Sequence, residues 1–221
     1  HNEVKASITY AERIQKALLD NKEQWDNISS EHFILFKPRD VVSGDFYWAY
    51  ANDDLAIWAA VDCTGHGVPG AFMSMLGVSF LNEIVADGGE TNPGRILDKL
   101  RSKIIKALEQ KSSTDERKDG MDMALCVWNK STNILQFAGA NNPLWIIKEG
   151  KTSNDDMLSS ETHYLSEIKG DKQPVGKHYQ EKPFTSHIIE LTKGDQFYLF
   201  TDGFADQFGG EKGKKFKYKN F

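Results

Sequence analysis

The chain has 221 residues, of which 39% are hydrophobic and 27% charged, with a formal net charge of −5. This length and composition are typical of a globular protein with one sizeable core. Residues 211–221 contribute +4, which leaves −9 on the rest of the chain. An acidic body argues against nucleic acid as the main partner, because phosphate backbones bind basic surfaces. The basic tail fits either a binding patch or a solvated end.

Targeting and redox signals are weak in this sequence. No uninterrupted apolar run approaches the roughly 18–20 residues that cross a bilayer, and the N-terminus has no signal-peptide core. Cys63 and Cys126 form neither a metal-binding pattern nor a disulfide framework. We therefore expect a cytoplasmic protein, without a membrane segment in this part of the chain.

The first predicted element is an amphipathic helix over residues 4–20. Its apolar stripe follows helical spacing, and an isolated helix of this length is only marginally stable. It must therefore dock on its own domain, on a second copy, or on an upstream segment. We divide the chain into a linker or switch helix (1–28) and a domain (29–221). The stripe consists of Val4, Ile8, Ala11, Ile14 and Leu18.

Strand patterns follow this helix. The run "HFILF" predicts a short strand over 32–36, and the runs 44–50 and 55–62 predict a hairpin around the turn-forming cluster 52–54. Residues 71–85 are apolar nearly all round, which predicts a helix buried on most sides. Gly88 and the following glycine end that helix.

The rest of the chain returns to strands after one more helix. Pro93, preceded by an asparagine, predicts the start of that helix. The polar stretch 149–185 predicts a long surface excursion. Helices inserted between strand hairpins indicate an α+β fold rather than a parallel βαβ sheet. Further strands are expected at 123–129, 134–140, 144–148 and 197–201.

The hairpin places two acids together. With its loop centred between positions 53 and 54, Trp48 faces Ala59 and Asp45 faces Asp62. Opposed like charges destabilise a sheet, and a hard divalent cation such as Mg²⁺ or Mn²⁺ would relieve that repulsion. A register slip that sends both acids into solvent is the alternative. Asp202, which also ends an apolar strand and precedes glycine, favours a carboxylate metal cluster.

The turn after Asp62 also fits G-x-G-x-x-G, from Gly65 to Gly70, which is a dinucleotide-binding pattern. Asp87 stands 22 positions beyond Gly65, where a ribose-binding acid is expected. However, Asp62 would direct negative charge at the pyrophosphate, Asp87 falls at the polar end of a helix, and the chain lacks doubly wound alternation. We therefore favour a cation at this turn.

Five motifs, in this order, resemble the SpoIIE-like branch of the PPM metal-dependent serine/threonine phosphatases. The resemblance implies two stacked, mainly antiparallel β-sheets flanked by helices, with a two-metal site at one edge. It also implies hydrolysis of phosphoserine or phosphothreonine on an anti-anti-sigma-like regulator in bacterial signalling, and an upstream sensor or repeat domain joined through the N-terminal helix. The motifs are "VVSGDFYW", "AAVDCTGHGVPGAFMSMLG", "DGMDMALC", "FAGANNPLW" and "LFTDGFAD".

By position, the resemblance implies that Asp62 bridges two divalent metals, Mn²⁺ or Mg²⁺. Asp45 and the backbone carbonyl of Cys63 would hold one metal, and Asp202 the other. Asp122 is a candidate accessory ligand. A water activated between the metals would then attack phosphorus.

Two further residues are candidates for chemistry. His66 lies in the turn that follows Asp62 (residues 63–70, called the metal loop below). It is a candidate general acid for the leaving alkoxide, or else a loop histidine that hydrogen-bonds the backbone. Arg39 is a candidate phosphate contact, or else pairs with an acid such as Asp40. Ser43 and Cys63 have no evident activating base and are expected to be structural.

The sequence departs from the family pattern at its end. The family closes with a strand that carries another metal-binding aspartate, whereas the only acid in the tail "EKGKKFKYKNF" is Glu211. We expect that the final strand lies outside this sequence. The departure favours an alternative function: a non-catalytic regulatory or binding domain with an incomplete metal site. A homodimer through the N-terminal helix is a further possibility.

Overall fold

The structure is a computed structural model that describes residues 2–108, 119–150, 158–211 and 213–218. Its helical elements are α1 (Asn2–Leu19), α2 (Lys22–Ile28), α3 (Gly67–Leu81), the π-helix η1 (Asn82–Asp87) and α4 (Pro93–Ala107). The longer strands are β1 (Phe46–Ala51), β2 (Leu55–Cys63), β3 (Gly120–Asn129), β4 (Ile134–Ala140), β5 (Leu144–Glu149) and β7 (His163–Ile168). The shorter strands are β6 (Leu158–Ser159), β8 (Val175–Gly176), β9 (His187–Glu190), β10 (Gln196–Tyr198), β11 (Phe208–Gly209) and β12 (Lys214–Lys215).

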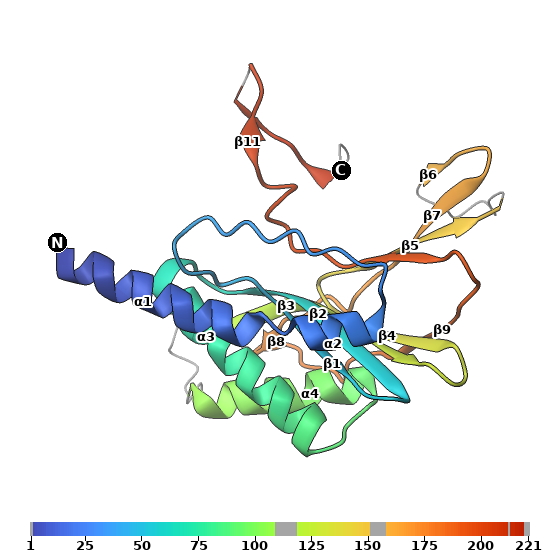
Figure 1. The fold of residues 1–221 in the computed structure, drawn as a ribbon, viewed down its shortest axis with the longest axis horizontal. Helices are drawn as coiled ribbons and strands as arrows, with labels where there is room; N and C mark the ends of the chain where they lie inside the picture. Colours follow the sequence, from blue (N-terminus) through green and yellow to red (C-terminus); the bar gives the residue numbers. More distant parts are fainter. Residues whose placement is uncertain (1, 109–118, 151–157, 212, 219–221) are drawn as a thin grey trace.

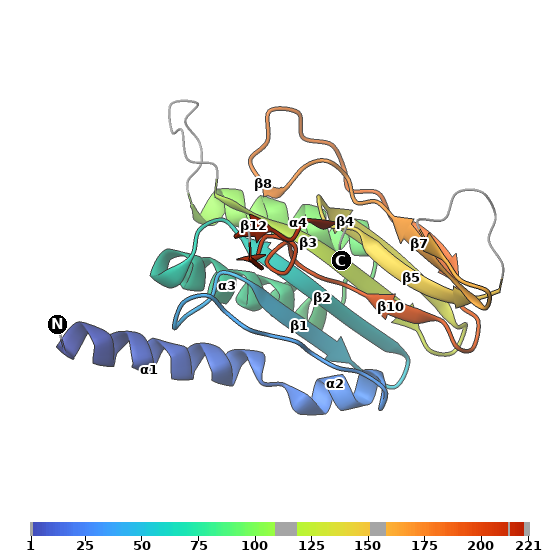
Figure 2. The same ribbon diagram turned by 90° about the horizontal axis from the view of Figure 1, so that it is seen from above.

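Two larger antiparallel sheets and a helical layer build the domain, and β11 and β12 form a separate two-stranded antiparallel sheet (Figures 1 and 2). One sheet has the order β1-β2-β3-β4-β9, with β8 added beside β3, and the other has the order β10-β5-β7-β6. Helices α3 and α4 cover one face of the larger sheet. The predicted α+β class with stacked antiparallel sheets is confirmed.

Strand β3 explains how the layers hold together. Its side chains alternate between two cores, because successive residues of a strand point to opposite faces. Met123 and Leu125 face the helices, whereas Ala124 and Cys126 face the second sheet. All four are fully buried. A strand buried on both faces therefore appears in the sequence as the nearly continuous apolar run "MALCV".

The predicted hairpin register is confirmed. Phe46 pairs with Val61 and Trp48 with Ala59, and the amide of Asn52 donates to the carbonyl of Leu55 at 2.9 Å. The short polar turn fixes this register, since one slipped residue would expose the whole buried face.

Helix α3 continues into η1 as one helical run over 67–87. By length and composition this run could cross a membrane. Its most apolar 18-residue stretch has a mean hydropathy of 1.4, but half of that stretch is buried inside the protein. The glycine at 77 allows the close packing, because a Cβ there would lie 2.6 Å from the ring of Phe46. The apolar character of the run is accounted for by contact with the sheet. Its C-cap, Gly88, and the predicted N1 proline of α4, Pro93, both occur as expected.

Helix α1 docks through only part of its surface. Gln15 and Leu19 are buried, whereas Val4, Ile14 and Leu18 of the predicted stripe are 62%, 41% and 46% exposed. The N-terminal turns extend beyond the rest of the domain in both views (Figures 1 and 2). The docking face is therefore rotated from the stripe and includes a polar residue.

Two secondary-structure expectations are wrong. Residues 32–36 form no strand: Phe33 and Leu35 are 73% and 64% exposed, and no strand in the described ranges pairs with them. The stretch 149–185 is not only a surface excursion, since β7 pairs with β5 along its length and β8 pairs with the start of β3. Residues 151–157 of this stretch lie outside the described part. The segment "HYLSEI" lacks the apolar–polar alternation of a strand with one buried face, and all six of its residues are half-buried, so the sequence pattern did not reveal β7.

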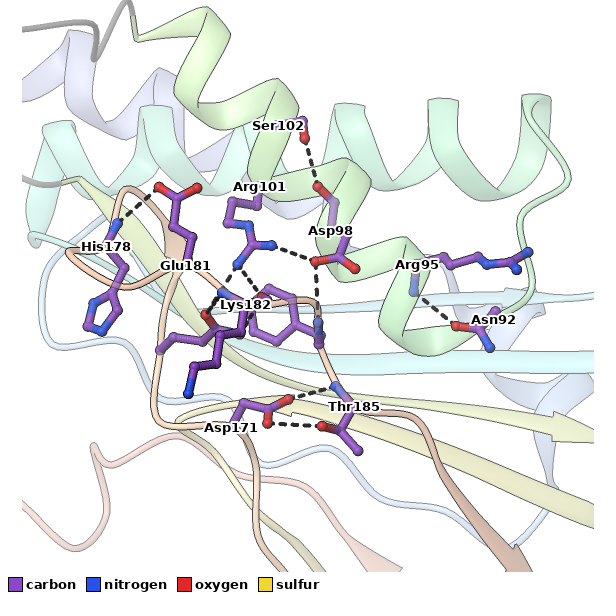
Figure 3. A network of polar contacts seen from close by, with 12 residues as sticks. Asn92, Arg95, Asp98, Arg101, Ser102, Asp171, His178, Glu181, Lys182 and Thr185 are labelled. Carbon is purple, nitrogen blue, oxygen red and sulfur yellow. Dashed lines mark hydrogen bonds and ion pairs between the residues drawn. The ribbon is translucent and has the colours of Figure 1, made fainter.

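A buried arginine fastens the segment after β7 to α4 (Figure 3). The guanidinium of Arg101 donates to Asp98 Oδ1 at 2.6 Å, to the carbonyl of Lys182 at 2.9 Å and to Gln173 Oε1 at 3.3 Å. It also lies 4.8 Å from the ring centre of Phe184. These bonds satisfy a charge that is otherwise costly to bury, and they position β8 beside β3.

Replacement of this arginine tests the fastening. We expect Arg101→Met to lower the free energy of unfolding by about 2–3 kcal/mol, because buried acceptors lose their donors. Hydrogen exchange should also become faster over 170–186. The exposed Arg95, whose side chain points away from this network in Figure 3, supplies the matched control Arg95→Met. Equal stability of the two variants would contradict the assignment.

Candidate metal and catalytic site

Four aspartates lie close together at one edge of the domain, beside the end of the core between the two sheets. Asp62 lies near the end of β2, Asp122 lies near the start of β3, Asp45 immediately precedes β1, and Asp202 follows β10. Three strands of one sheet and the edge strand of the other thus contribute to a single cluster. The structure brings together all four of the aspartates that the sequence singled out.

Strand pairing accounts for three of these positions. Asp62 and Asp122 are direct partners in the β2–β3 register, so their side chains share a face. Asp45 lies one residue beyond the last pair of the hairpin, Phe46 with Val61. Alternation along β2 and β3 places Asp62 and Asp122 on the same face as Trp58 and Cys126, which pack between the sheets. The acids therefore end the inter-sheet core.

The fourth aspartate is held by contacts of the segment that follows β10. Thr201 donates its hydroxyl hydrogen to Asp45 Oδ2 at 2.7 Å, although the two residues are 156 positions apart. A Cβ on Gly203 would lie 3.9 Å from the same oxygen. Asp202, between them, is consequently held against the acids of the larger sheet.

Crowding of these carboxyls shifts the pKa of the central one. Burial, followed by the negative charges of Asp45 and Asp202, raises the pKa of Asp62 to about 8. Protonated Asp62 also donates a hydrogen bond to Asp45, which favours the neutral form. The bound proton thus removes part of the repulsion among the carboxylates that a divalent cation would also remove.

Burial also raises the pKa values of the neighbouring acids. Burial raises the pKa of Asp122, opposed by a hydrogen bond that Asn141 Nδ2 donates to Asp122 Oδ1 at 2.7 Å. Burial and the charge of Asp206 raise the pKa of Asp202. Burial, and then the charges of Asp202 and Asp206, raise the pKa of Tyr218 to about 12, so the C-terminal segment also lies near the cluster.

The donor set fits hard divalent cations. Carboxylate oxygens that are partly buried and mutually repelling suit Mg²⁺ or Mn²⁺. As the side chains stand, no group of three His, Cys, Asp or Glu residues in the described ranges is arranged to hold a metal ion. Metal binding would therefore need rotations of these side chains. The ion would then take the place of the proton that Asp62 donates to Asp45.

Three glycines let the backbone of the metal loop pack closely. A Cβ on Gly44 would lie 2.5 Å from the carbonyl oxygen of Gly65 and 3.3 Å from that of Cys63. A Cβ on Gly70 would lie 2.6 Å from the carbonyl oxygen of Gly65 and 2.9 Å from the Cα of Gly44. Gly65 itself has φ +90, which side chains disfavour. The glycine pattern thus serves a tight turn beside Asp45 and Cys63.

The candidate general acid has an acidic partner. His66 is the N-cap of α3, and its Nδ1 lies 2.9 Å from Asp40 Oδ2. Arg39 is exposed in the same loop, and Asp40 pairs with His66 rather than with this arginine. Ser43 is buried, with its backbone N–H bonded to Gln15, which agrees with a structural role.

Sequence reasoning missed the residues that support the acids. Asn141, at φ 59, donates to Asp122, and Thr201 donates to Asp45. Each stands within one of the quoted motifs, and Thr201 immediately precedes Asp202. No local spacing could have shown which acid each would contact.

The pH dependence of the stability of the metal-free protein tests the repulsion among these carboxyls. The raised pKa keeps the Asp62 proton bound in the folded state up to about pH 8, whereas the ordinary pKa of an aspartate is 3.8. Metal-free stability should therefore fall as pH rises across this window. Asp62→Asn should flatten that dependence. If solvent screening leaves only about 1 kcal/mol of repulsion, its Tm at pH 8 should exceed that of the parent chain by about 2–4 °C. A lower Tm for the variant at pH 8 would contradict the crowding.

The family model for Stage II sporulation protein E matches residues 52–220. Among solved structures, the SiaA-PP2C domain of Pseudomonas aeruginosa is 32% identical, with a TM-score of 0.80 over 99% of this chain and 79% of that one. A search of curated protein sequences gave no significant match.

More distant structures share the fold. The RsbU and RsbW domains of Rv1364c from Mycobacterium tuberculosis are 19% identical, with a TM-score of 0.56 over 77% of this chain and 42% of that one. The PP2C domain of SpoIIE from Bacillus subtilis, solved with a fragment of its regulatory domain, is 18% identical, with a TM-score of 0.55 over 75% of this chain and 43% of that one.

Proposed function

Because this chain belongs to the SpoIIE family of PPM-type phosphatases, we propose that it hydrolyses phosphoserine or phosphothreonine on a regulatory protein in bacterial signalling. The observation that carries the proposal is the meeting of four aspartates between the two sheets. Their mutual electrostatic effects join residues from positions 45 to 202. A structural role does not explain why like charges are concentrated where each raises the cost of the others.

The proposed metal ligands are residues of this cluster. Asp62 would bridge two divalent ions, Asp45 and the carbonyl of Cys63 would hold one, and Asp202 the other, with Asp122 as an accessory ligand. Mn²⁺ or Mg²⁺, when bound, would supply an activated water and screen the phosphate charge. RsbX, a structural neighbour 16% identical to this chain, was solved in complex with magnesium.

The chain's own residues would orient and protonate the substrate. Asp40 fixes the ring of His66 through Nδ1, which leaves Nε2 to donate a proton to the leaving oxygen. Such positioned acids typically contribute 10²–10⁴-fold to a rate. Arg39, exposed one residue before Asp40, is proposed to contact the phosphate or an acidic flank of the substrate.

The proposed partners follow from the family and from α1. The substrate would be a phosphorylated, anti-anti-sigma-like regulator. The exposed residues of α1, among them Val4 and Tyr10, would pack against an upstream sensor domain or a second copy of the chain.

A second candidate function is a regulatory domain that binds its phosphorylated partner without hydrolysis. It is favoured by the side-chain arrangement, in which no three potential ligands in the described ranges form a ready metal site. Calorimetric titration with Mn²⁺ distinguishes the two: two sites support the enzyme, and one or none supports the binding domain.

Turnover of a phosphoserine protein tests the enzyme directly. We expect activity in Mn²⁺ or Mg²⁺, none in EDTA, and a loss of at least 100-fold in Asp62→Asn, since this carboxylate would contact both ions. Asp54→Asn, in the exposed turn of the same hairpin, is the matched control and should retain full activity. Activity that persists in EDTA would refute the metal-dependent mechanism.

The role of His66 is tested by varying the leaving group. His66→Ala should lower kcat for a phosphoserine substrate about 100-fold, with a much smaller effect on p-nitrophenyl phosphate, whose leaving group needs little protonation. Asp40→Asn should lie between the parent and His66→Ala. Equal losses on both substrates would show that His66 does not act as the general acid.

A further inference from the structure

The hairpin formed by β11 and β12 (residues 203–211 and 213–217, called the β11–β12 hairpin) exposes aromatic side chains. Phe208 is 74% exposed, and Phe204 and Phe216 are also exposed. In Figure 1 the hairpin projects well beyond the two larger sheets. A two-stranded hairpin is only marginally stable in water by itself, and contiguous exposed apolar surface typically marks an interaction site. Packing within the domain core does not account for these rings.

The aromatic rings of this hairpin line a groove of about 370 Å³ together with two lysines. Phe204 and Phe216 meet edge to face, with 5.4 Å between their ring centres. Lys215 pairs with Asp206 at 2.5 Å, and Lys214 adds a further positive charge to the lining. No acidic residue of the described ranges lines the groove. It therefore offers apolar surface and positive charge together.

Backbone hydrogen bonds tie the hairpin to the aspartate cluster. The N–H of Asp206 donates to the carbonyl of Asp202 at 2.9 Å, and the N–H of Lys217 donates to the carbonyl of Ala205 at 2.7 Å. Ala205 is fully buried, which fixes the base of the hairpin on the domain. The groove thus borders the place where a phosphoryl group would bind, and residues that flank a bound phosphoserine would come within its reach.

The distribution of charge indicates which partner the groove fits. Residues 211–221 contribute +4, whereas the rest of the chain carries −9. An acidic domain repels an acidic partner over most of its surface, so the basic hairpin is the part of this edge that can hold acidic side chains. Opposite charges across an interface favour the correct partner, and like charges exclude wrong ones.

We propose that the β11–β12 hairpin is the substrate-recognition element of the aspartate site, and that its groove takes the residues flanking the phosphorylated serine or threonine. An apolar side chain of the substrate would pack on Phe208 and its neighbouring rings, and an acidic side chain would pair with Lys214. The groove thus selects phosphoproteins whose modified residue stands in an acidic segment with an apolar residue near by. This inference rests on the proposed function, since a substrate must bring its phosphoryl group to the four aspartates.

Two synthetic phosphoserine peptides of equal length test this selection. Both carry a leucine next to the phosphoserine, and the remaining flanking positions are glutamates in one peptide and lysines in the other. p-Nitrophenyl phosphate has no flanking residues and therefore reports on the chemistry at the aspartates. The quantity measured is kcat/KM for each substrate in Mn²⁺, with the 221-residue chain and its variants.

Two variants change the groove, and each has a matched control. Lys214→Glu reverses one charge, and Phe208→Ser removes the most exposed ring. Lys193→Glu is the charge control, because Lys193 is exposed before β10 whereas Asp202 follows that strand. Ile188→Ser is the apolar control: Ile188 is 73% exposed on β9, the edge of the larger sheet opposite β1.

We expect the parent chain to prefer the glutamate peptide about 10-fold in kcat/KM, mainly through KM, because like charges oppose binding of the lysine peptide. Lys214→Glu should abolish or invert this preference. Phe208→Ser should lower kcat/KM on both peptides about 10-fold, because a buried apolar contact is lost. Both variants should affect p-nitrophenyl phosphate much less. Both control variants should behave as the parent chain does on all three substrates.

Three results would overturn this inference alone. They are no preference of the parent chain between the peptides, equal losses of the groove variants on peptides and p-nitrophenyl phosphate, and a sedimentation coefficient of the parent chain that falls in Phe208→Ser. The last result would assign the groove to contact between two copies of the chain. Failure of the parent chain to hydrolyse either peptide would overturn the proposed function and this inference with it.

Discussion

Repulsion among carboxyls is the constraint around which this domain is arranged. Sheet pairing places Asp62 beside Asp122, and the hydroxyl of Thr201, in the segment that follows β10, donates a hydrogen bond to Asp45. Burial and the surrounding charges raise the pKa of Asp62 to about 8, so the folded protein keeps a proton that an exposed aspartate releases at much lower pH. The fold accepts an unfavourable cluster that a divalent cation would turn into a favourable one.

The rest of the structure serves to keep that cluster together. The close contact of Gly44 with Gly70 leaves the metal loop little freedom, and the two cores on either side of β3 fix the strand that carries Asp122. The Arg101 network positions the segment that pairs with the first residues of β3. Packing energy from a large apolar core thus offsets a local electrostatic cost at its edge.

Sequence reasoning recovered what local rules determine. The turn at 52–54 fixes the hairpin register, and with it the proximity of Asp45 to Asp62. The β2–β3 pairing joins residues about 60 positions apart, so the partnership of Asp122 with Asp62 could not be read from spacing. Residues 32–36 show the opposite limit, since an apolar run had strand propensity without a pairing partner in the described part of the chain. Gln15 gave no signal, because a buried amide on a helix looks like any surface glutamine.

Anomalous diffraction from crystals of this chain, grown or soaked with Mn²⁺, tests the proposed metal site most directly. We expect manganese peaks bonded to Asp62 together with Asp45 or Asp202, with the Asp62 carboxyl rotated toward the ion. Ordered manganese elsewhere, with the four aspartates left as they are, would contradict it.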